Sequence, residues 1–355
     1  MDSSWNQIEQ KALKNEALTH EESLEILLSS DDDLMNLITV AKRVREKYFG
    51  KRVKLNYLVN VKSGLCPEDC HYCSQSKDSK APIEKYPLMT PEEVVASVER
   101  GLEVGAKRAC LVASGRGPGS RELNSFCDSV KSLKEKHPHV EVCACLGLLG
   151  EGQADQLKDA GVFAYNHNIN TSKAHYEKIC GTHDYEDRID TIEKSKCAGL
   201  SSCSGVLAGM GEENSDLVEM ALTLREKKAE SIPVNFLVSH EKTPLQGLNN
   251  LNPQRCLRIL ALFRLTNPSA EIRIAGGREV HLRHLQPLGL MIANSIFIGD
   301  YLTTKGQTPQ QDLEMIRDLG YVIEGQPADF LEKYLGRPKS SSEFKSEKAA
   351  ITVGL

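Results

Sequence analysis

The chain alternates short apolar runs with amphipathic stretches from about residue 50 onwards. The runs are rich in β-branched residues and short enough to be single buried strands. They cover residues 53–61, 108–114, 140–147, 162–170, 201–210, 231–240, 271–277 and 295–302. Between them, segments such as 91–105 and 121–137 carry apolar residues at helical spacing, with charges on the opposite face. The pattern therefore predicts alternating strands and helices around a parallel sheet.

Eight predicted strands in this order indicate an α/β fold of the (β/α)8 TIM-barrel type over residues 50–320. A doubly wound open sheet is the alternative, because periodicity alone does not prove closure. Residues 1–49 predict an N-terminal helical extension of two or three helices, covering the bottom or a side of the barrel. Residues 321–355 form a short C-terminal segment, whose polar tail from Arg337 is expected to be flexible and partly disordered.

Composition and charge exclude several classes of function. With 355 residues, of which 40% are hydrophobic, the chain can bury a large core. A net charge of −5 provides no basic surface for nucleic acid, and no apolar run is long enough to span a membrane. The polar N-terminus does not resemble a secretion signal, so the 11 cysteines are expected to be reduced thiols in the cytoplasm. Four of them fall in predicted helices or loops, where buried cysteines usually fill the core: Cys127, Cys180, Cys197 and Cys256.

Three cysteines follow the first predicted strand in the segment GLCPEDCHYCSQS. Cys66, Cys70 and Cys73 have the spacing CxxxCxxC and lie at the carboxyl end of the strand, which is the catalytic face of a barrel. A structural zinc site takes four protein ligands, whereas three thiolates leave part of an iron–sulfur cluster open to another ligand. The motif therefore predicts such a cluster. A zinc knuckle with a distant fourth ligand, such as His71, is the alternative.

CxxxCxxC after the first strand of a β/α barrel is the signature of the radical S-adenosylmethionine superfamily, and KSGLCPEDCHYCSQS resembles biotin synthases in particular. Similar segments follow in order along the chain: ASGRGP (113–118), CACLG (143–147), YNHNINTS (165–172), CSGVLAGMGE (203–212), VNFL (234–237), IRIAGGRE (272–279) and NSIFIGDYLTT (294–304). The resemblance covers residues 45 to 320, approximately. The first motif is shared by many radical enzymes, but the ordered set is highly specific.

Cys110, Cys143 and Cys203 lie in the second, third and fifth predicted strands, and inward-facing strand positions converge on the axis of a barrel. Taken alone, each of these three cysteines is better interpreted as a small hydrophobic residue that fills the core. Arg273, however, interrupts the apolar strand EIRIAGG, and a buried guanidinium needs a partner. The resemblance implies that these cysteines and Arg273 hold a 2Fe–2S cluster. Cys145 points the same way as Cys143, so strand parity does not choose between them.

The segment YNHNINT predicts Asn166, Asn168 and Asn170 on one face of the fourth strand, where each buried amide needs hydrogen bonds. They suit a neutral polar ligand, although a polar ladder at the barrel mouth is the alternative. The resemblance implies that Asn166 and Asn235 contact dethiobiotin, and that Asn168 and position 170, where the family usually has Asp, contact the cofactor. Arg188 resembles the residue that pairs with the carboxylate of S-adenosylmethionine, with an exposed helix charge as the alternative.

The resemblance implies a complete reaction. A 4Fe–4S cluster binds S-adenosylmethionine through its open iron, and reduction yields a 5′-deoxyadenosyl radical that abstracts hydrogen from dethiobiotin. The 2Fe–2S cluster then supplies the sulfur that completes biotin. A reductase or flavodoxin-type electron donor, a homodimer and a cytoplasmic location are also implied, with no nucleic acid and no membrane as partners.

Two other functions fit parts of the sequence. Lipoyl synthase also inserts sulfur on a similar barrel, but it carries a second cysteine run before the first motif, and no cysteine precedes Cys66 here. A zinc-dependent binding or structural protein would explain the thiols without catalysis.

Overall fold

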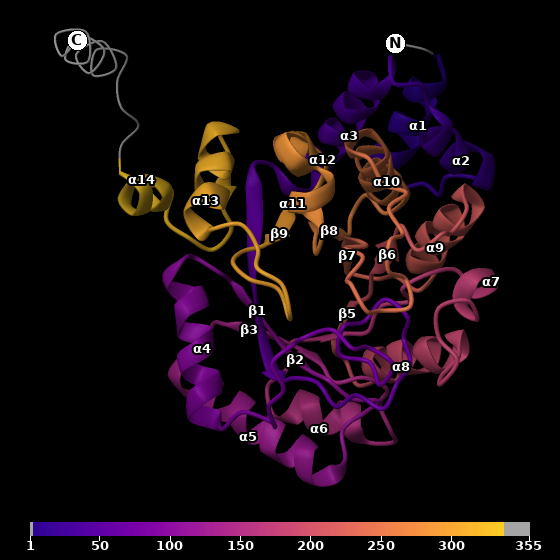
Figure 1. Cartoon of the computed structure of the whole chain (residues 1–355). Helices are drawn as coiled ribbons and strands as arrows, with labels where there is room; N and C mark the ends of the chain where they lie inside the picture. Colours follow the sequence, from indigo (N-terminus) through magenta and orange to yellow (C-terminus); the bar gives the residue numbers. More distant parts are fainter. Residues whose placement is uncertain (1–2, 337–355) are drawn as a thin grey trace, which may run out of the picture.

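The computed structural model describes residues 3–336, and its centre is a parallel sheet that closes on itself (Figure 1). The strands of the ring are β1 Arg52–Lys62, β2 Arg108–Ala113, β3 Glu141–Cys145, β4 Ala164–Asn166, β5 Ser201–Cys203, β6 Val206–Ala208, β7 Ser231–Phe236, β8 Glu271–Ile274 and β9 Ser295–Phe297. β1 pairs with both β2 and β9, while β5 and β6 share one position beside β7. The predicted TIM-type barrel is confirmed, and the open sheet is wrong.

Most strands of the ring are shorter than the apolar runs that predicted them, and two runs show this most clearly. β4 covers three residues of the run 162–170, and the run 201–210 is broken at Ser204 and Gly205 into β5 and β6. Gly205 passes so close to β7 that a Cβ atom there would lie 2.0 Å from the carbonyl oxygen of Pro233. The backbone therefore follows a path that only glycine permits.

Helices connect the strands and surround the barrel (Figure 1). They are α4 Pro91–Glu103, α5 Ser120–Lys136, α6 Gln153–Asp159, α7 Lys173–Tyr176, α8 Tyr185–Cys197, α9 Asn214–Glu226, α10 Pro253–Thr266, α11 Arg278–His281, the 3-10 turn η1 Arg283–Leu285 and α12 Gln286–Ile292. Local sequence explains how α4 begins, because Thr90 and Glu93 form a capping box and Pro91 occupies the first turn. Its buried face carries Val94 and Val98.

The N-terminal residues form α1 Ser3–Leu13, α2 His20–Leu28 and α3 Leu34–Phe49, which pack along α9, α10 and α12 at the side of the barrel. Arg45 of α3 is fully buried and joins the extension to the barrel. Its guanidinium donates to the carbonyl oxygens of Arg52 at 2.8 Å and Ala293 at 3.2 Å, and also to that of Gly50. The predicted helical extension therefore shares its core with the barrel.

The chain ends with α13 Pro309–Asp318, β10 Val322–Ile323 and α14 Phe330–Leu335. β10 pairs with the first residues of β1, outside the ring. A strand of two residues has too little pattern to be predicted from sequence. The expected flexible tail from Arg337 lies outside the described residues.

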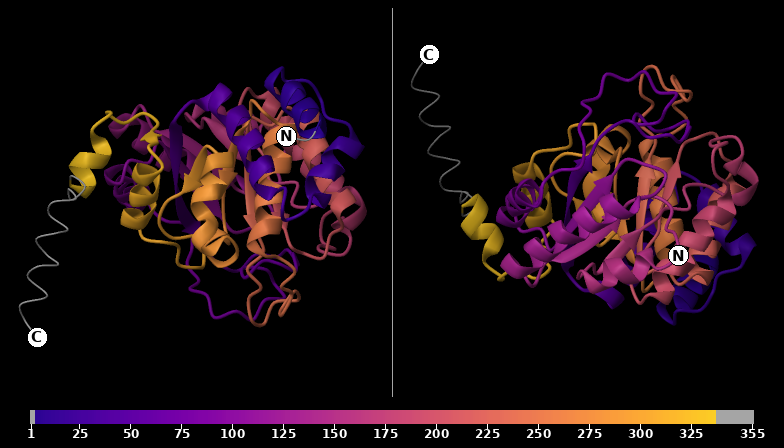
Figure 2. Two further views of the ribbon diagram at one scale, coloured as in Figure 1. Left: turned by 90° about the horizontal axis from the view of Figure 1, so that it is seen from above. Right: turned by 90° about the horizontal axis from the view of Figure 1, so that it is seen from below.

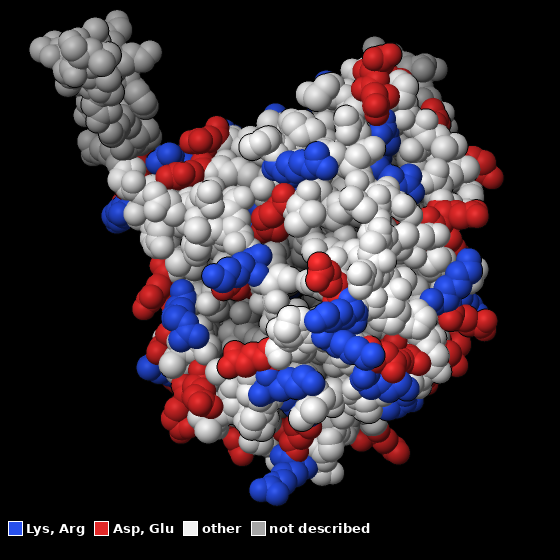
Figure 3. Space-filling view, in the orientation of Figure 1, with Lys and Arg blue, Asp and Glu red and all other residues white. Residues whose placement is uncertain are grey.

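The surface carries acidic and basic side chains in alternation rather than one large patch of either sign on the face seen in Figure 3. This distribution agrees with the small net charge of −5. Within residues 3–336, none of the helices combines the length and the apolar character that a membrane span requires.

Inward-facing side chains fill the barrel in layers, as alternate positions of parallel strands do. The lowest layer, which we call the charged layer, consists of Lys54, Arg108, Glu141 and Glu271. Lys54 Nζ lies 2.9 Å from a Glu141 carboxylate oxygen and 3.5 Å from one of Glu271, while Arg108 Nη1 reaches Glu271 at 3.5 Å. These ion pairs join different strands, so the charged layer closes the amino-terminal end of the barrel.

Two residues further along the strands lies a layer of thiols with one guanidinium. It contains Cys110, Cys143, Cys203 and Arg273, all of them buried. Cys110 is directly opposite Cys143 in the register of β2 and β3. Above this layer the barrel opens into a cavity of about 310 Å³.

Candidate active site

The CxxxCxxC cysteines lie on the long segment between β1 and α4, at the carboxyl end of the barrel. This segment projects beside residues 238–252 (Figure 2), and Lys80 N donates to Lys242 O at 3.1 Å. Cys70 is buried, Cys66 and Cys73 are half-buried, and all three line one cavity of about 220 Å³. The three thiols that the motif singled out therefore share one space.

Burial governs the protonation of these thiols. Desolvation raises the pKa of Cys66, and it raises that of Cys73 to about 11. A hydrogen bond with Cys180, followed by desolvation, raises the pKa of Cys70. Because metals bind thiolates, a metal at this loop must displace protons when it binds.

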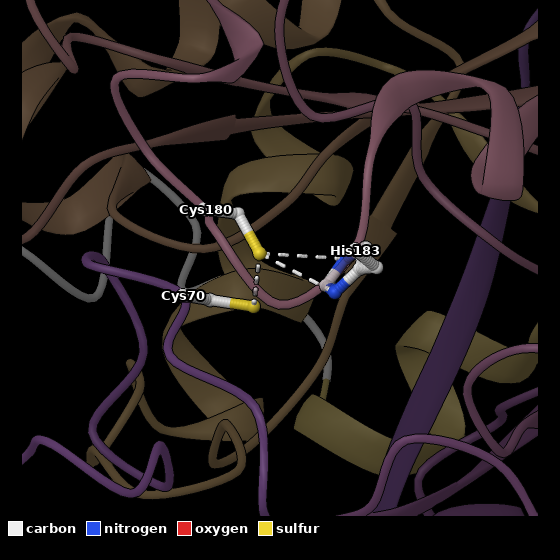
Figure 4. A group of neighbouring side chains, drawn as sticks. All are labelled: Cys70, Cys180 and His183. Atoms are coloured by element: carbon white, nitrogen blue, oxygen red, sulfur yellow. Dashed lines mark hydrogen bonds between the residues drawn. The ribbon is translucent and has the colours of Figure 1, made fainter.

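Two residues that the sequence did not single out as ligands lie against Cys70, as Figure 4 shows. Cys180 Sγ is 3.9 Å from Cys70 Sγ, and His183 contributes its Nδ1 at 3.3 Å and its Nε2 at 3.7 Å from Cys180 Sγ. The interpretation of Cys180 as simple core filler misses this contact. Among the described residues, His71 is not part of the group. Cysteine and histidine three residues apart suit a metal, but nothing in the sequence indicates that this segment returns to the first loop.

Two acidic residues between the motif cysteines tie the loop to the segment before α8. Asp69 accepts hydrogen bonds from Gly181 N at 2.9 Å and Thr182 N at 3.1 Å. Glu68 accepts one from Thr182 Oγ1 at 2.6 Å and a short one from His183 Nδ1. These bonds hold the loop in place although it has little regular secondary structure.

Arg188 of α8 is buried and lines the same cavity, so the alternative of an exposed helix charge is wrong. Its guanidinium donates to Asn168 O at 2.9 Å and His183 Nε2 at 2.9 Å, and also to the hydroxyl of Tyr176. A cation fixed in this way beside Cys70 can bind a carboxylate.

The predicted asparagines lie inside the barrel mouth, where Asn166, Asn168 and Asn170 line both cavities and Asn235 lines the one of about 310 Å³. Asn166 Nδ2 donates to Asn168 Oδ1 at 3.1 Å and contacts Cys203 Sγ at 3.2 Å, which links the cavity to the thiol layer. Asn235 donates to Val206 O at 3.0 Å and accepts from Gly276 N at 3.0 Å. Amide oxygens and N–H groups therefore face one space, as a ligand with both donors and acceptors requires.

Asn170 reaches the cavity by a different route from the one predicted. It lies beyond the end of β4 with a left-handed backbone, φ 66°, so strand alternation does not place its side chain. Asparagine tolerates this conformation better than most residues. Its Nδ2 donates to the Tyr72 hydroxyl at 2.6 Å.

The inner thiols interact with one another and with Arg273. Hydrogen bonds from Cys110 and Cys203 raise the pKa of Cys143, and the hydrogen bond with Cys143 lowers the pKa of Cys203 to about 5. Arg273 Nη1 lies 3.9 Å from Cys203 Sγ, while Nη2 donates to Glu271 at 2.6 Å. It also donates to the hydroxyls of Ser231 at 2.9 Å and Ser295 at 3.3 Å, so the buried guanidinium has the partners that its charge requires. Cys145 lies outside this thiol group and lines the cavity above it.

Comparisons with known proteins agree with this geometry. The Radical SAM superfamily model matches residues 60–224, and the Biotin and Thiamin Synthesis associated domain matches residues 233–322. Biotin synthase 2 of Frankia casuarinae is 53% identical over 93% of this chain and 91% of its own. Biotin synthase of Streptomyces coelicolor is 56% identical over 90% of this chain and 79% of its own.

Solved structures of lower identity share the fold. The FeFe-hydrogenase maturase HydG from Carboxydothermus hydrogenoformans superposes with a TM-score of 0.77 at 19% identity, covering 93% of this chain and 81% of its own. Methylornithine synthase (PylB) superposes with a TM-score of 0.74 at 21% identity, covering 96% of this chain and 99% of its own.

The closed barrel with the CxxxCxxC loop at its carboxyl end, together with the superfamily match, defines a radical S-adenosylmethionine enzyme. Within that class, the identity over most of the chain is decisive: the chain belongs to the biotin synthase family.

Proposed function

We propose that this chain converts dethiobiotin to biotin by inserting a sulfur atom between two saturated carbons of dethiobiotin. The observation that carries this proposal is a pair of neighbouring cavities in the barrel mouth that share Asn166, Asn168 and Asn170, with the motif thiols lining the outer cavity and the inner thiol layer in contact with Asn166. Cys66, Cys70 and Cys73 line the outer cavity, and Asn166 Nδ2 lies 3.2 Å from Cys203 Sγ. Radical chemistry at one end and a sulfur source at the other is the arrangement that this reaction needs.

Cys66, Cys70 and Cys73 would hold a 4Fe–4S cluster. Soft thiolates in a partly buried loop are suitable ligands, and three of them leave one iron open. When bound, this cluster and S-adenosylmethionine supply a 5′-deoxyadenosyl radical. The chain's own contribution is to fix the loop through Glu68 and Asp69 and to keep water from the radical.

Arg188, Asn168 and Asn170 would bind S-adenosylmethionine. Arg188 offers a guanidinium that matches a carboxylate, and the two amides match the hydroxyl groups of a ribose. Asn170 already donates to Tyr72, which fixes its amide toward the cavity. A neutral amide in place of the acid usual at this position keeps an acceptor but lacks the charge.

Cys110, Cys143, Cys203 and Arg273 would hold a 2Fe–2S cluster. The donor set fits, because the three thiols and the guanidinium are buried together and no apolar side chain separates Arg273 from Cys203. When bound, this cluster supplies the sulfur atom. Arg273 and Arg108 provide positive charge that offsets thiolates in a dry interior.

Asn166 and Asn235 would bind dethiobiotin. Its ureido ring carries N–H and C=O groups, and each asparagine offers both kinds of partner. Both side chains line the cavity of about 310 Å³ together with apolar groups of Leu58 and Phe297, which suit the aliphatic part of the substrate.

The proposal is tested with the full-length chain, reconstituted anaerobically with iron and sulfide and supplied with a chemical reductant, S-adenosylmethionine and dethiobiotin. We expect biotin, together with about two molecules of 5′-deoxyadenosine per biotin, because two C–H bonds are broken. Cys70→Ser should abolish the formation of 5′-deoxyadenosine. Cys110→Ala should abolish the formation of biotin but still release 5′-deoxyadenosine. Formation of 5′-deoxyadenosine without biotin by the unaltered, fully reconstituted chain would contradict the substrate assignment.

We also infer a reductase or flavodoxin-type electron donor, a homodimer and a cytoplasmic location, all from the family. Cys66 is half-buried and its neighbour Leu65 is exposed, so a donor protein can approach the loop at this point. Turnover with and without a candidate flavodoxin, and the mass measured by light scattering, test the first two.

A further inference from the structure

Dethiobiotin carries a carboxylate at the end of its aliphatic chain, and the function proposed above assigns no residue to this group. Among the described residues that line the cavity of about 310 Å³, none is a lysine or an arginine, and His240 is the only one whose side chain can carry a positive charge. We propose that His240 binds this carboxylate and thereby selects an acid over neutral molecules of the same shape. The inference rests on the proposed function and names the residue that recognises the far end of the substrate.

The order of residues from Asn235 to His240 follows the order of groups along the substrate. Asn235 lies near the carboxyl end of β7, where it is proposed to bind the ureido ring. Leu237 and Val238 come next and line the same cavity, and their apolar character suits the aliphatic chain. His240 follows them in the segment after the strand and also lines this cavity. One stretch of chain therefore presents an amide, apolar groups and an imidazole to the same space.

The imidazole of His240 is half-buried and has no hydrogen-bond, ion-pair or ring partner within the part of the chain that the structure describes. His281, which packs near the same segment, differs in this respect, because its Nε2 lies 2.7 Å from Leu237 O in a hydrogen bond. The ring of His240 is therefore available to a ligand. An imidazole donates an N–H in either protonation state and adds a positive charge when it is protonated.

The backbone holds His240 in place although its segment has no regular secondary structure. The carbonyl oxygen of His240 accepts a hydrogen bond from Thr243 Oγ1 at 2.8 Å. Lys80 N donates to Lys242 O at 3.1 Å, which ties the segment to the loop that carries the motif cysteines. A ring that is positioned in advance loses less conformational freedom when the ligand binds.

The experiment measures the binding of dethiobiotin and of its alcohol analogue, in which CH₂OH replaces the carboxylate, by calorimetric titration. It uses the full-length chain with S-adenosylmethionine and with clusters reconstituted anaerobically and kept oxidised, so that no turnover occurs. The unaltered chain should bind dethiobiotin at least about 10-fold more tightly than the alcohol, the effect of one hydrogen bond to a charged group. His240→Ala should bind dethiobiotin as weakly as the alcohol, and should bind the alcohol as the unaltered chain does.

Two variants and one further titration separate a direct contact from indirect effects. His240→Lys, which returns a positively charged donor, should regain the preference for the acid. Lys242→Ala is the matched control: it removes an exposed cation from the same segment, keeps the backbone bond to Lys80 and should behave as the unaltered chain does. His240→Ala should also bind S-adenosylmethionine normally, because it leaves the residues proposed to bind the cofactor unchanged.

The outcomes distinguish this inference from the proposed function. If the unaltered chain binds neither compound, the substrate assignment fails, and the inference fails with it. If the unaltered chain binds dethiobiotin and His240→Ala keeps the same preference for the acid over the alcohol, the substrate assignment stands and the role of His240 is wrong. An equal loss of this preference in Lys242→Ala would also overturn the role of His240, because the general charge of the segment would then be responsible.

Discussion

Cys143 and Cys145 face the same way on β3, but they differ by one layer of the barrel. Cys143 is fully buried opposite Cys110, whereas Cys145 lines the cavity. The parity of a strand fixes the face of a side chain and not its height, so the sequence left this choice open. The contacts between strands supply the missing information.

This difference predicts unequal effects of two neighbouring substitutions. Cys143→Ala should remove the inner cluster and all biotin formation, because a thiol of the buried group is lost. Cys145→Ala should retain the iron and absorption of the inner cluster and change the free energy of unfolding by less than about 2 kcal/mol. Iron analysis and visible absorption of both variants, reconstituted side by side, measure this. The reverse pattern would move the ligand to Cys145.

Arg273 lies between a thiol and a carboxylate, and the two contacts have different consequences. Removing the guanidinium takes one hydrogen bond from Glu271, which keeps Ser295 Oγ at 2.8 Å and the cations Lys54 and Arg108 at 3.5 Å each. Glu271 is therefore not left as an unpaired buried charge, which would cost about 3–5 kcal/mol.

Arg273→Met should accordingly destabilise the cluster-free chain by at least about 1.5–3 kcal/mol, the range for one charged hydrogen bond, because the bond to Ser231 Oγ at 2.9 Å is lost together with that to Glu271. It should also lower the reduction potential of the inner cluster, because a nearby positive charge is lost. Chemical denaturation and a redox titration test the two effects. Arg264→Met is the control: this equally buried arginine donates to Ile292 O and Asn294, so its loss should reduce stability without moving the potential. An unshifted potential in Arg273→Met would rule out its contact with the cluster.

At the scale of elements, the break between β5 and β6 shapes the active site. Gly205 N donates to Asn168 Oδ1 at 2.9 Å, and Gly205 O accepts from Asn170 N at 3.2 Å. The glycine thus positions both asparagines that are proposed to bind the cofactor. No Cβ fits there, because the carbonyl of Pro233 would lie 2.0 Å from it.

Gly205→Ala should therefore force β6 away from β7, with a loss of about 1–3 kcal/mol in the free energy of unfolding. We expect binding of S-adenosylmethionine to weaken more than ten-fold, about 1.4 kcal/mol or more. Gly119→Ala is the matched control, since a Cβ there meets nothing within 4 Å and its φ is −72°. Calorimetric titration with S-adenosylmethionine compares the affinities of the two variants. Equal affinities would show that the break between β5 and β6 is unimportant for binding the cofactor.

The pattern of the chain predicted most elements because alternating and helical periods are local properties. Prediction from the sequence pattern failed where the position of a residue or strand depends on segments that are distant in the sequence. The left-handed Asn170 is set by the partners of its backbone in β6, and β10 exists only because β1 offers a free edge. Cys180 lies against Cys70 because hydrogen bonds, such as that from Gly181 N to Asp69, join two segments that are more than a hundred residues apart in sequence. The family resemblance singled out the cysteines that are proposed to hold the clusters, whereas the contact between Cys180 and Cys70 is visible only in the folded chain.

At the scale of the whole molecule, the ion pairs of the charged layer, formed by Lys54, Arg108, Glu141 and Glu271, cross the amino-terminal end of the barrel, whereas the cavity lined by the asparagines lies at the carboxyl end. If the proposed inner cluster gives up its sulfur and is rebuilt between turnovers, iron and sulfide would enter through the mouth that also admits the substrate. Rebuilding would then have to wait while biotin or a fresh dethiobiotin molecule occupies the mouth. A high concentration of dethiobiotin would accordingly slow recovery between turnovers.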